Sequence, residues 1–176
     1  DLVYVVARDS TAWALDSDNG RIAWQLTGVP SSGNFAGGAS PAVSGEYVIF
    51  PLPSGEVLAT YPMGGIPRWS TVVTGDRLGN AATLVRDISG DPVIVGNRVY
   101  IGNFGGRTVA MNLSDGTRIW TAAEGALSPV WSAGNAVFFI NDINELVRLD
   151  AATGEPVWRA PLPTFTNDER TRRQRS

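Results

Sequence analysis

One spacing pattern recurs four times along the chain and constrains its fold more than any other feature. In each copy a glycine follows the first residue by six positions and a tryptophan follows it by ten. The copies start at Ala14, Ala59, Ala110 and Arg148, and their glycine and tryptophan pairs are Gly20 and Trp24, Gly65 and Trp69, Gly116 and Trp120, and Gly154 and Trp158. Fixed spacing of this kind indicates a repeat protein in which each copy forms one structural unit.

The residue types at these positions explain how one unit folds. Asn19-Gly20 and Asp115-Gly116 are typical of hairpin turns, where glycine adopts a positive φ at little cost. The segments before the glycines alternate apolar and polar residues, which predicts half-buried β-strands. A large flat indole at the same place in every unit predicts packing between neighbouring units. We therefore assign the four tryptophans and four glycines to the repeat core and none of them to a binding site.

Each unit contains four short predicted strands, here called A to D in chain order. In the third unit these strands cover residues 92–95, 98–101, 108–111 and 118–120. Successive tryptophans of the pattern are 45, 51 and 38 residues apart, and four-stranded units of roughly 40–50 residues are the size of β-propeller blades. The sequence therefore predicts an all-β propeller with about four antiparallel blades. The predicted boundaries are 2–28 for blade 1, which lacks strand A, 41–74 for blade 2, 92–122 for blade 3, 129–161 for blade 4, and 162–176 for a loop or tail.

Composition narrows the chemistry that the chain can perform. None of the 176 residues is cysteine or histidine, which excludes disulfides, thiolate catalysis and the commonest catalytic base. The formal net charge of −3 is too small to indicate a partner, and no apolar run approaches the ~20 residues of a membrane helix. We predict no bound metal. Because residue 1 already lies in a strand pattern, we expect the chain to be a piece of a longer protein.

The connections from strand D to the next strand A differ in length. The first covers residues 28–40, the second 75–91, and the third only 122–128. Connections of one type leave a propeller on the same face, so the two long ones should lie side by side. Long loops on a rigid scaffold are where binding usually resides. We therefore predict a partner-binding rim at these two loops, which combine aromatic, apolar and charged side chains.

The repeat, read as A-x-D-x-x-x-G-x-x-x-W, resembles that of pyrroloquinoline-quinone (PQQ) type propellers. Three segments make the whole chain resemble one family among them, the outer-membrane protein assembly factor BamB: residues 37–41, 75–78 and 86–93. The resemblance implies about half of an eight-bladed propeller. It also implies a non-enzymatic lipoprotein without a cofactor, at the periplasmic face of the outer membrane of a Gram-negative bacterium. The lipid-bearing cysteine would lie upstream of Asp1.

The resemblance further implies a subunit of the β-barrel assembly (BAM) machinery. Its partners would be the POTRA domains of the barrel insertase BamA and unfolded outer-membrane proteins. In the family, docking uses two neighbouring D-to-A loops, one with two leucines and an arginine, the other with two aspartates one residue apart. Aligning on Pro92 places Asp87 at the first aspartate and Ser89 at the second. The resulting partner-binding candidates are Asp87, Ser89, Arg77, Arg86 and, as apolar anchor, Phe35.

Two other functions are compatible with the repeat. A PQQ-dependent dehydrogenase would need a calcium-binding set of carboxylates and amides on the propeller axis, for which the candidates are Asn103, Asn112, Asn141 and Asp142. Such residues near strand ends are typical of turns, and the vicinal cysteines common in those enzymes are absent. A generic ligand-binding propeller, for example for carbohydrate, would use Gly105-Gly106 and Trp131.

Two further expectations concern the arginine-rich tail and the blade faces at the two ends of a half propeller. The tail carries four arginines, but a polar charged run is usually a solvated segment, so we predict no nucleic-acid partner. These arginines are Arg170, Arg172, Arg173 and Arg175. A half propeller exposes two blade faces that normally pack on neighbours, and such apolar faces favour association. We therefore expect this chain to be oligomeric alone or to belong to a larger whole.

Overall fold

The computed structural model describes residues 1–30, 38–73, 88–103 and 105–163, which form fifteen β-strands and no helix. The strands make four antiparallel sheets in chain order, one with three strands and three with four. This architecture confirms the all-β prediction. No helix in the described part of the chain is long and apolar enough to cross a membrane.

Each sheet is a meander in which consecutive strands pair, and each forms one blade. Blade 1 comprises β1 (Leu2–Val6), β2 (Thr11–Asp16) and β3 (Ile22–Thr27), and blade 2 comprises β4 (Ala42–Val43), β5 (Val48–Pro51), β6 (Glu56–Thr60) and β7 (Pro67–Val72). Blade 3 comprises β8 (Val93–Val95), β9 (Arg98–Asn103), β10 (Arg107–Asn112) and β11 (Arg118–Ala122), and blade 4 comprises β12 (Trp131–Ala133), β13 (Ala136–Ile140), β14 (Glu145–Asp150) and β15 (Pro156–Pro161).

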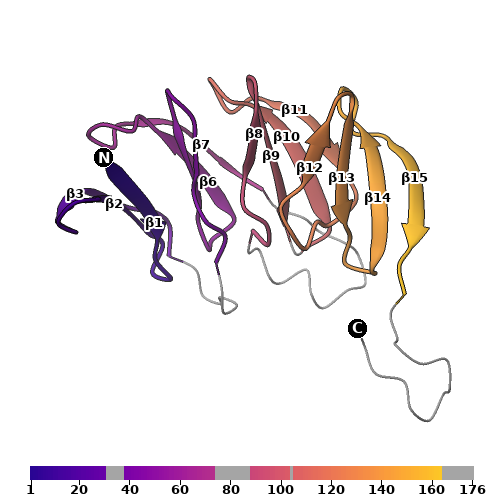
Figure 1. Cartoon of the computed structure of the whole chain (residues 1–176), viewed down its shortest axis with the longest axis horizontal. Helices are drawn as coiled ribbons and strands as arrows, with labels where there is room; N and C mark the ends of the chain where they lie inside the picture. The colour runs from indigo at the N-terminus through magenta and orange to yellow at the C-terminus, as the bar shows by residue number, and fades with distance from the viewer. Residues whose placement is uncertain (31–37, 74–87, 104, 164–176) are drawn as a thin grey trace, which may run out of the picture.

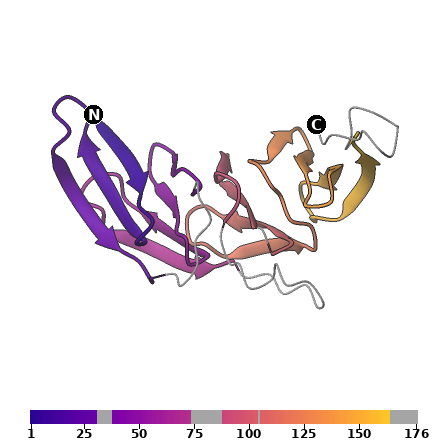
Figure 2. The same ribbon diagram turned by 90° about the horizontal axis from the view of Figure 1, so that it is seen from below.

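The blades follow one another side by side along the molecule, from β1–β3 at one end to β12–β15 at the other (Figure 1). The same order along the long axis is seen from below (Figure 2). The turns between strands A and B and between strands C and D therefore lie at one end of every blade. The turns between strands B and C and the connections from D to A lie at the other end.

Each of the first three repeat tryptophans lies against the repeat glycine of the next blade. A β-carbon added to Gly65, Gly116 or Gly154 would stand 2.5–2.6 Å from the indole of the preceding blade, so only glycine fits there. All three glycines also have positive φ, from 65° to 74°. The indole nitrogens of Trp24, Trp69 and Trp120 donate hydrogen bonds to the carbonyls of Pro62, Leu113 and Ala151, at 3.0, 2.8 and 3.0 Å.

The hydrophobic core consists of three clusters, one between each pair of adjacent blades. Its largest cluster joins Ile49 and Ala59 of blade 2 to Val99 and Met111 of blade 3. Because inner blades have a neighbour on both sides, all four residues of β5 are buried, and β9 is buried at every position but the first. Half-buried strands were expected before the repeat glycines. That expectation is wrong for β6, which is buried at every position but the first, and it describes the second half of β14, where buried and half-buried residues alternate.

The two end blades leave one face open. On blade 1 the open face presents Val3 and Val5, and nothing stands within 4 Å of the position of a β-carbon at Gly20. On blade 4 it presents Trp131, which is 73% exposed, and Trp158, which is 39% exposed. Within the described residues, the fourth tryptophan of the repeat has no glycine of a following blade against it.

Candidate docking rim

We call the end of the blades that carries the D-to-A connections the docking rim. Its described residues are 28–30, 38–41, 88–92 and 123–129, together with the turns between strands B and C. Four of the five predicted partner-binding residues, Phe35, Arg77, Arg86 and Asp87, lie outside the described residues. The described part of the docking rim consists of the segments that anchor their loops.

The starts of the A strands of neighbouring blades contact each other at the rim. The backbone N–H of Ser40, before blade 2, donates to the Asp91 carboxylate, before blade 3, at 2.5 Å. A β-carbon at Gly90 would lie 2.6 Å from the carbonyl of Ser128, before blade 4. Charge-assisted hydrogen bonds and backbone packing of this kind hold the three connections in a fixed order. The ends of the two long loops are consequently adjacent.

Asn103 holds both ends of the second long loop. Its side-chain amide donates to the carbonyl of Val73 at 3.1 Å, just where that loop begins. Its backbone forms an isolated bridge with Ile88, just where the loop ends. Asn103 is fully buried, and its side-chain oxygen accepts the N–H of Arg107 at 2.9 Å. The amide of Asn103 is thus satisfied by backbone groups of Val73 and Arg107.

Ser89 is the one predicted rim residue within the described part. Its hydroxyl donates to the carbonyl of Ala126 and lies 3.5 Å from the carbonyl of Gly102. Its N–H donates to the same Gly102 carbonyl at 3.2 Å. Ser89 is half-buried and joins blade 3 to the connection that leads into blade 4. Its polar groups therefore serve the scaffold in this structure, and a contact with a partner stays a prediction.

The first long loop is anchored by blade 2. Glu56, at the start of β6, accepts the N–H of Val29 at 3.3 Å and the hydroxyl of Ser70 at 2.5 Å. The N–H of Gly28 donates to the carbonyl of Ser10 at 2.8 Å. The chain segment that carries Phe35 therefore leaves blade 1 from a point bonded to both blade 1 and blade 2.

A polar cluster ties the third, short connection to blade 4. The buried carboxylate of Glu124 accepts two bonds from the Arg159 guanidinium, at 2.9 and 2.5 Å. Its other oxygen accepts the Asn141 amide at 3.2 Å, and that amide also donates to Glu145 at 3.0 Å. Sequence reasoning missed this cluster, since its members come from three separate segments. Charge-assisted hydrogen bonds and buried amides of this kind fix a connection in place.

The dehydrogenase candidates do not gather into one site. Asn103 and Asn141 lie at the docking rim, whereas Asn112 lies at the other end of its blade and caps Ser114 at 3.0 Å. Within the described ranges, no three acidic side chains are grouped to hold a metal ion. Of the carbohydrate candidates, Gly106 has a φ of 89° in the β9–β10 turn, and Trp131 lies on the open face of blade 4. The two are therefore in different places.

Comparison with known proteins places the chain among assembly factors. The sequence profile of a family described as "Outer membrane protein assembly factor BamB" matches residues 1–160. The assembly factor BamB of Shewanella oneidensis is 23% identical over 158 residues, which are 90% of this chain and 40% of that protein. The assembly factor BamB of Kangiella koreensis is 27% identical over 120 residues, 68% of this chain and 31% of that protein. The chain spans less than half the length of these curated relatives.

Solved structures show the same fold. The crystal structure of BamB from Moraxella catarrhalis matches with a TM-score of 0.80 at 23% identity, covering 90% of this chain and 48% of that one. The quinohemoprotein alcohol dehydrogenase from Comamonas testosteroni matches with a TM-score of 0.73 at 16% identity, covering 91% and 33%. These likenesses confirm the predicted propeller fold, of which this chain forms about half. Because the profile match spans all four blades, the chain belongs to the family of the outer-membrane protein assembly factor BamB.

Proposed function

We propose that this chain is part of a non-enzymatic, periplasmic lipoprotein subunit of the outer-membrane β-barrel assembly machinery. The docking rim binds the POTRA domains of BamA, and the subunit assists the insertion of unfolded outer-membrane proteins. Phe35, Arg77, Arg86 and Asp87 supply the contacts, with Ser89 at the base of their loops. A lipid on an upstream residue holds the subunit at the periplasmic face of the outer membrane.

The adjacency of the two loop anchors carries this proposal. Interfaces need apolar anchors surrounded by polar groups on a preorganised surface. The hydrogen bond between Ser40 and Asp91 joins the ends of the two loops. The contacts of Asn103 with Val73 and Ile88 hold the beginning and the end of the second loop. The loops themselves contain an aromatic residue, two arginines and an aspartate. This combination fits a protein surface better than a small-molecule pocket.

The dehydrogenase alternative receives less support. The relatives whose profile matches the chain are named as assembly factors, while the alcohol dehydrogenase shares the fold at 16% identity. The amides that would have to bind calcium are bonded to backbone and side-chain groups of the blades. Those bonds would have to break before the oxygens and nitrogens could reach an axial cofactor.

The direct test is binding of the chain, shown to be folded by circular dichroism, to purified POTRA domains of the cognate insertase. Asp87→Arg reverses a charge on the docking rim, and we expect it to weaken binding about tenfold or more, as charge reversals at an interface do. Asp18→Arg is the matched control, because Asp18 is an exposed acid on the β2–β3 turn at the opposite end of blade 1.

Equal binding by the two variants would remove the docking rim from the proposal. No binding by the folded chain would leave the missing blades as the remaining source of the site. The same two substitutions would then be compared in the full-length protein. If the docking rim lies at these loops, Asp87→Arg must weaken binding there and Asp18→Arg must not.

A further inference from the structure

The turn between strands C and D departs from the repeat in blade 2 alone. In the other blades the residue two places after the first repeat position is an acid or amide, namely Asp16, Asn112 and Asp150. Each caps the turn by accepting backbone N–H groups two or three residues on, at 2.9–3.3 Å. In blade 2 this residue is Tyr61, which cannot cap the turn in this way.

The same turn displays apolar side chains that its counterparts lack. Met63 is 77% exposed and Ile66 is 62% exposed, whereas the equivalent positions in blade 1 are Asp18 and Arg21. Thr60, the residue before Tyr61, is buried, and its hydroxyl has no hydrogen-bond partner. The other blades have leucine or methionine at this position. Blade 2 therefore lacks the side-chain cap of this turn and buries a hydroxyl that has no hydrogen-bond partner. Local departures of this kind are characteristic of functional sites.

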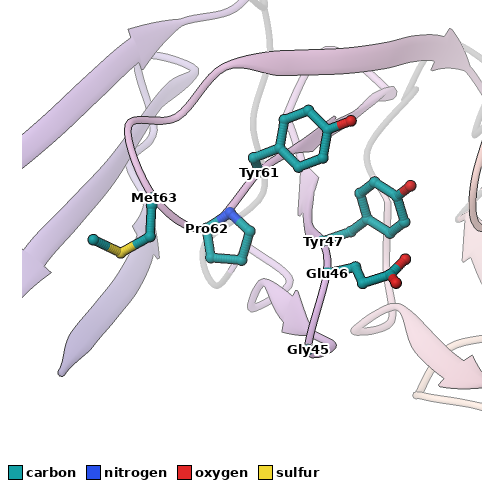
Figure 3. A pocket seen from close by; sticks show the side chains of 6 residues that line it. All are labelled: Gly45, Glu46, Tyr47, Tyr61, Pro62 and Met63. Carbon is teal, nitrogen blue, oxygen red and sulfur yellow. The ribbon is translucent and has the colours of Figure 1, made fainter.

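Tyr61 and Met63 line an open pocket at the end of blade 2 opposite the docking rim. Its volume is about 580 Å³, and its lining combines the β4–β5 and β6–β7 turns: Gly45, Glu46, Tyr47, Tyr61, Pro62 and Met63. The rings of Tyr47 and Tyr61 lie 5.7 Å apart between centroids, with an interplanar angle of 31°. Figure 3 shows both hydroxyls and the Glu46 carboxylate on one side of the pocket, and Met63 pointing to the other.

The pocket is held in shape by the neighbouring blade. The carbonyl of Pro62 accepts the indole N–H of Trp24 at 3.0 Å and the hydroxyl of Tyr4 at 3.3 Å. Tyr47 is nearly fully buried and belongs to the core cluster between blades 2 and 3. Tyr47 and the backbone of Pro62 are thus fixed before any ligand arrives, which lowers the entropic cost of binding.

We propose that this pocket, which we call the tyrosine pocket, binds a cationic side chain of an extended polypeptide, with apolar residues beside it. Its lining contains the exposed ring of Tyr61, the nearly buried ring of Tyr47 and one carboxylate, but no basic residue. Aromatic faces and a carboxylate attract an arginine or lysine head group, while the aliphatic stem packs on the rings. Met63 and Ile66 receive apolar side chains two residues away, since residues i and i+2 of an extended chain lie on the same side.

The test is an NMR titration of the ¹⁵N-labelled chain with the peptide Leu-Ser-Arg-Ser-Leu, blocked at both ends. The matched peptide carries glutamate in place of arginine, and phosphocholine tests whether a lipid head group supplies the cation instead. We expect saturable shifts at Glu46, Tyr47 and Tyr61 with the arginine peptide. The glutamate peptide should bind about fivefold or more weakly, as expected from the loss of a cation–π contact and an ion pair.

Two variants connect the binding to the pocket. Tyr61→Asn restores the capping residue of blade 3, so the turn should fold at least as well, while binding of the arginine peptide falls about threefold to tenfold. Glu46→Gln should weaken it about twofold to fivefold. Glu155→Gln changes an exposed acid on the β14–β15 turn, the turn of blade 4 that corresponds to the Tyr61 turn, and should leave binding unchanged.

Four results would overturn the proposal: no binding of the arginine peptide, equal binding of the two peptides, unchanged binding by Tyr61→Asn, or tighter binding of phosphocholine than of the peptide. The tyrosine pocket lies at the opposite end of the blade from the docking rim. Its test is therefore independent of the proposed contact with the POTRA domains.

Discussion

The three closed interfaces between blades and the open face of blade 4 use the same row of positions with different residues. Facing the next blade, blade 2 presents Ala42, Ile49, Ala59 and Trp69, paired across its four strands, and blade 3 presents Val93, Tyr100, Ala110 and Trp120. Blade 4 presents Trp131, Phe138, Arg148 and Trp158. The third position of this row is alanine in blades 1 to 3 and arginine in blade 4.

This difference shows what close packing between blades requires. Ala14, Ala59 and Ala110 are fully buried, so a methyl group fills the space between adjacent sheets. Arg148 is half-buried beside the rings of Phe138 and Trp158, whose centroids lie 6.0 Å apart. A blade that packed on blade 4 as closely as blade 4 packs on blade 3 would have to make room for this guanidinium. The closed and open faces are therefore not interchangeable.

Exchanging the third residue of the row should have the largest effect. Ala110→Arg places a charged, bulky side chain in a fully buried position and should destabilise the fold by about 4 kcal/mol or more. Arg148→Ala, at the equivalent position on the open face, should change the free energy of unfolding by no more than about 0.5 kcal/mol. Urea denaturation followed by circular dichroism measures both. Similar losses for the two variants would show that the face of blade 4 is covered in solution.

The tryptophans should give the next largest difference. Trp69→Ala removes an indole that packs on Gly116 and donates to Leu113, and we expect a loss of about 3–5 kcal/mol. Trp158→Ala removes an indole with no following blade in this chain, and the loss should stay below about 1.5 kcal/mol. Differential scanning calorimetry at several protein concentrations compares the two. A concentration-dependent loss in Trp158→Ala would mean that the open faces associate, as expected for a half propeller.

The smallest effect concerns the β14–β15 turn, which supports the closed interface between blades 3 and 4. Hydrogen bonds from the N–H groups of Ala152 and Thr153 lower the pKa of Asp150 below its ordinary value of 3.8. Because the pKa of Asp150 is lower in the folded chain than in the unfolded chain, its carboxylate contributes its full stabilisation above the pKa of the unfolded state. That stabilisation is lost as the pH falls through the pKa of the folded state. Because Ala151 in this turn accepts the indole N–H of Trp120, the NMR signal of that N–H should shift as the pH falls below 3.8.

Asp150→Asn provides the control for this titration. It keeps an acceptor for the turn but removes the titrating group, so the acid-induced shift of the Trp120 indole signal should disappear. Persistence of the shift in the variant would assign it to another acid and separate the turn from the interface.

Much of the fold could be predicted from spacing alone. The positions of glycine and tryptophan indicate a hairpin turn and a packing contact in every unit, because a positive φ and a large apolar surface are local requirements. The alternating strands and the length of the unit then predict four-stranded blades. The docking rim could be predicted only in part, because the sequence identifies the two long loops but not the contacts that hold their ends together.

Asn103 and Glu124 show why the rest escaped prediction. As a sequence feature, Asn103 is an amide near a strand end, compatible with a turn or a metal ligand. Its role follows from two contacts. It donates a hydrogen bond to Val73, 30 positions earlier in the chain, and it forms an isolated bridge with Ile88. Glu124 meets Arg159 across 35 positions. Contacts at such separations depend on how the blades stack, which no local pattern encodes.

By itself the sequence determined the unit: its strands, its glycine turn and its tryptophan, because these follow from backbone conformation and from the periodicity of apolar residues. Only the tertiary structure decided which copies of the unit are equivalent. It buries Trp120 and leaves Trp158 on an open face, although both follow the same spacing. It also places Tyr61 beside Tyr47 in a pocket where the other blades cap a turn. The physical reason is that burial and pocket shape belong to pairs of neighbouring segments, whereas a repeat describes one unit at a time.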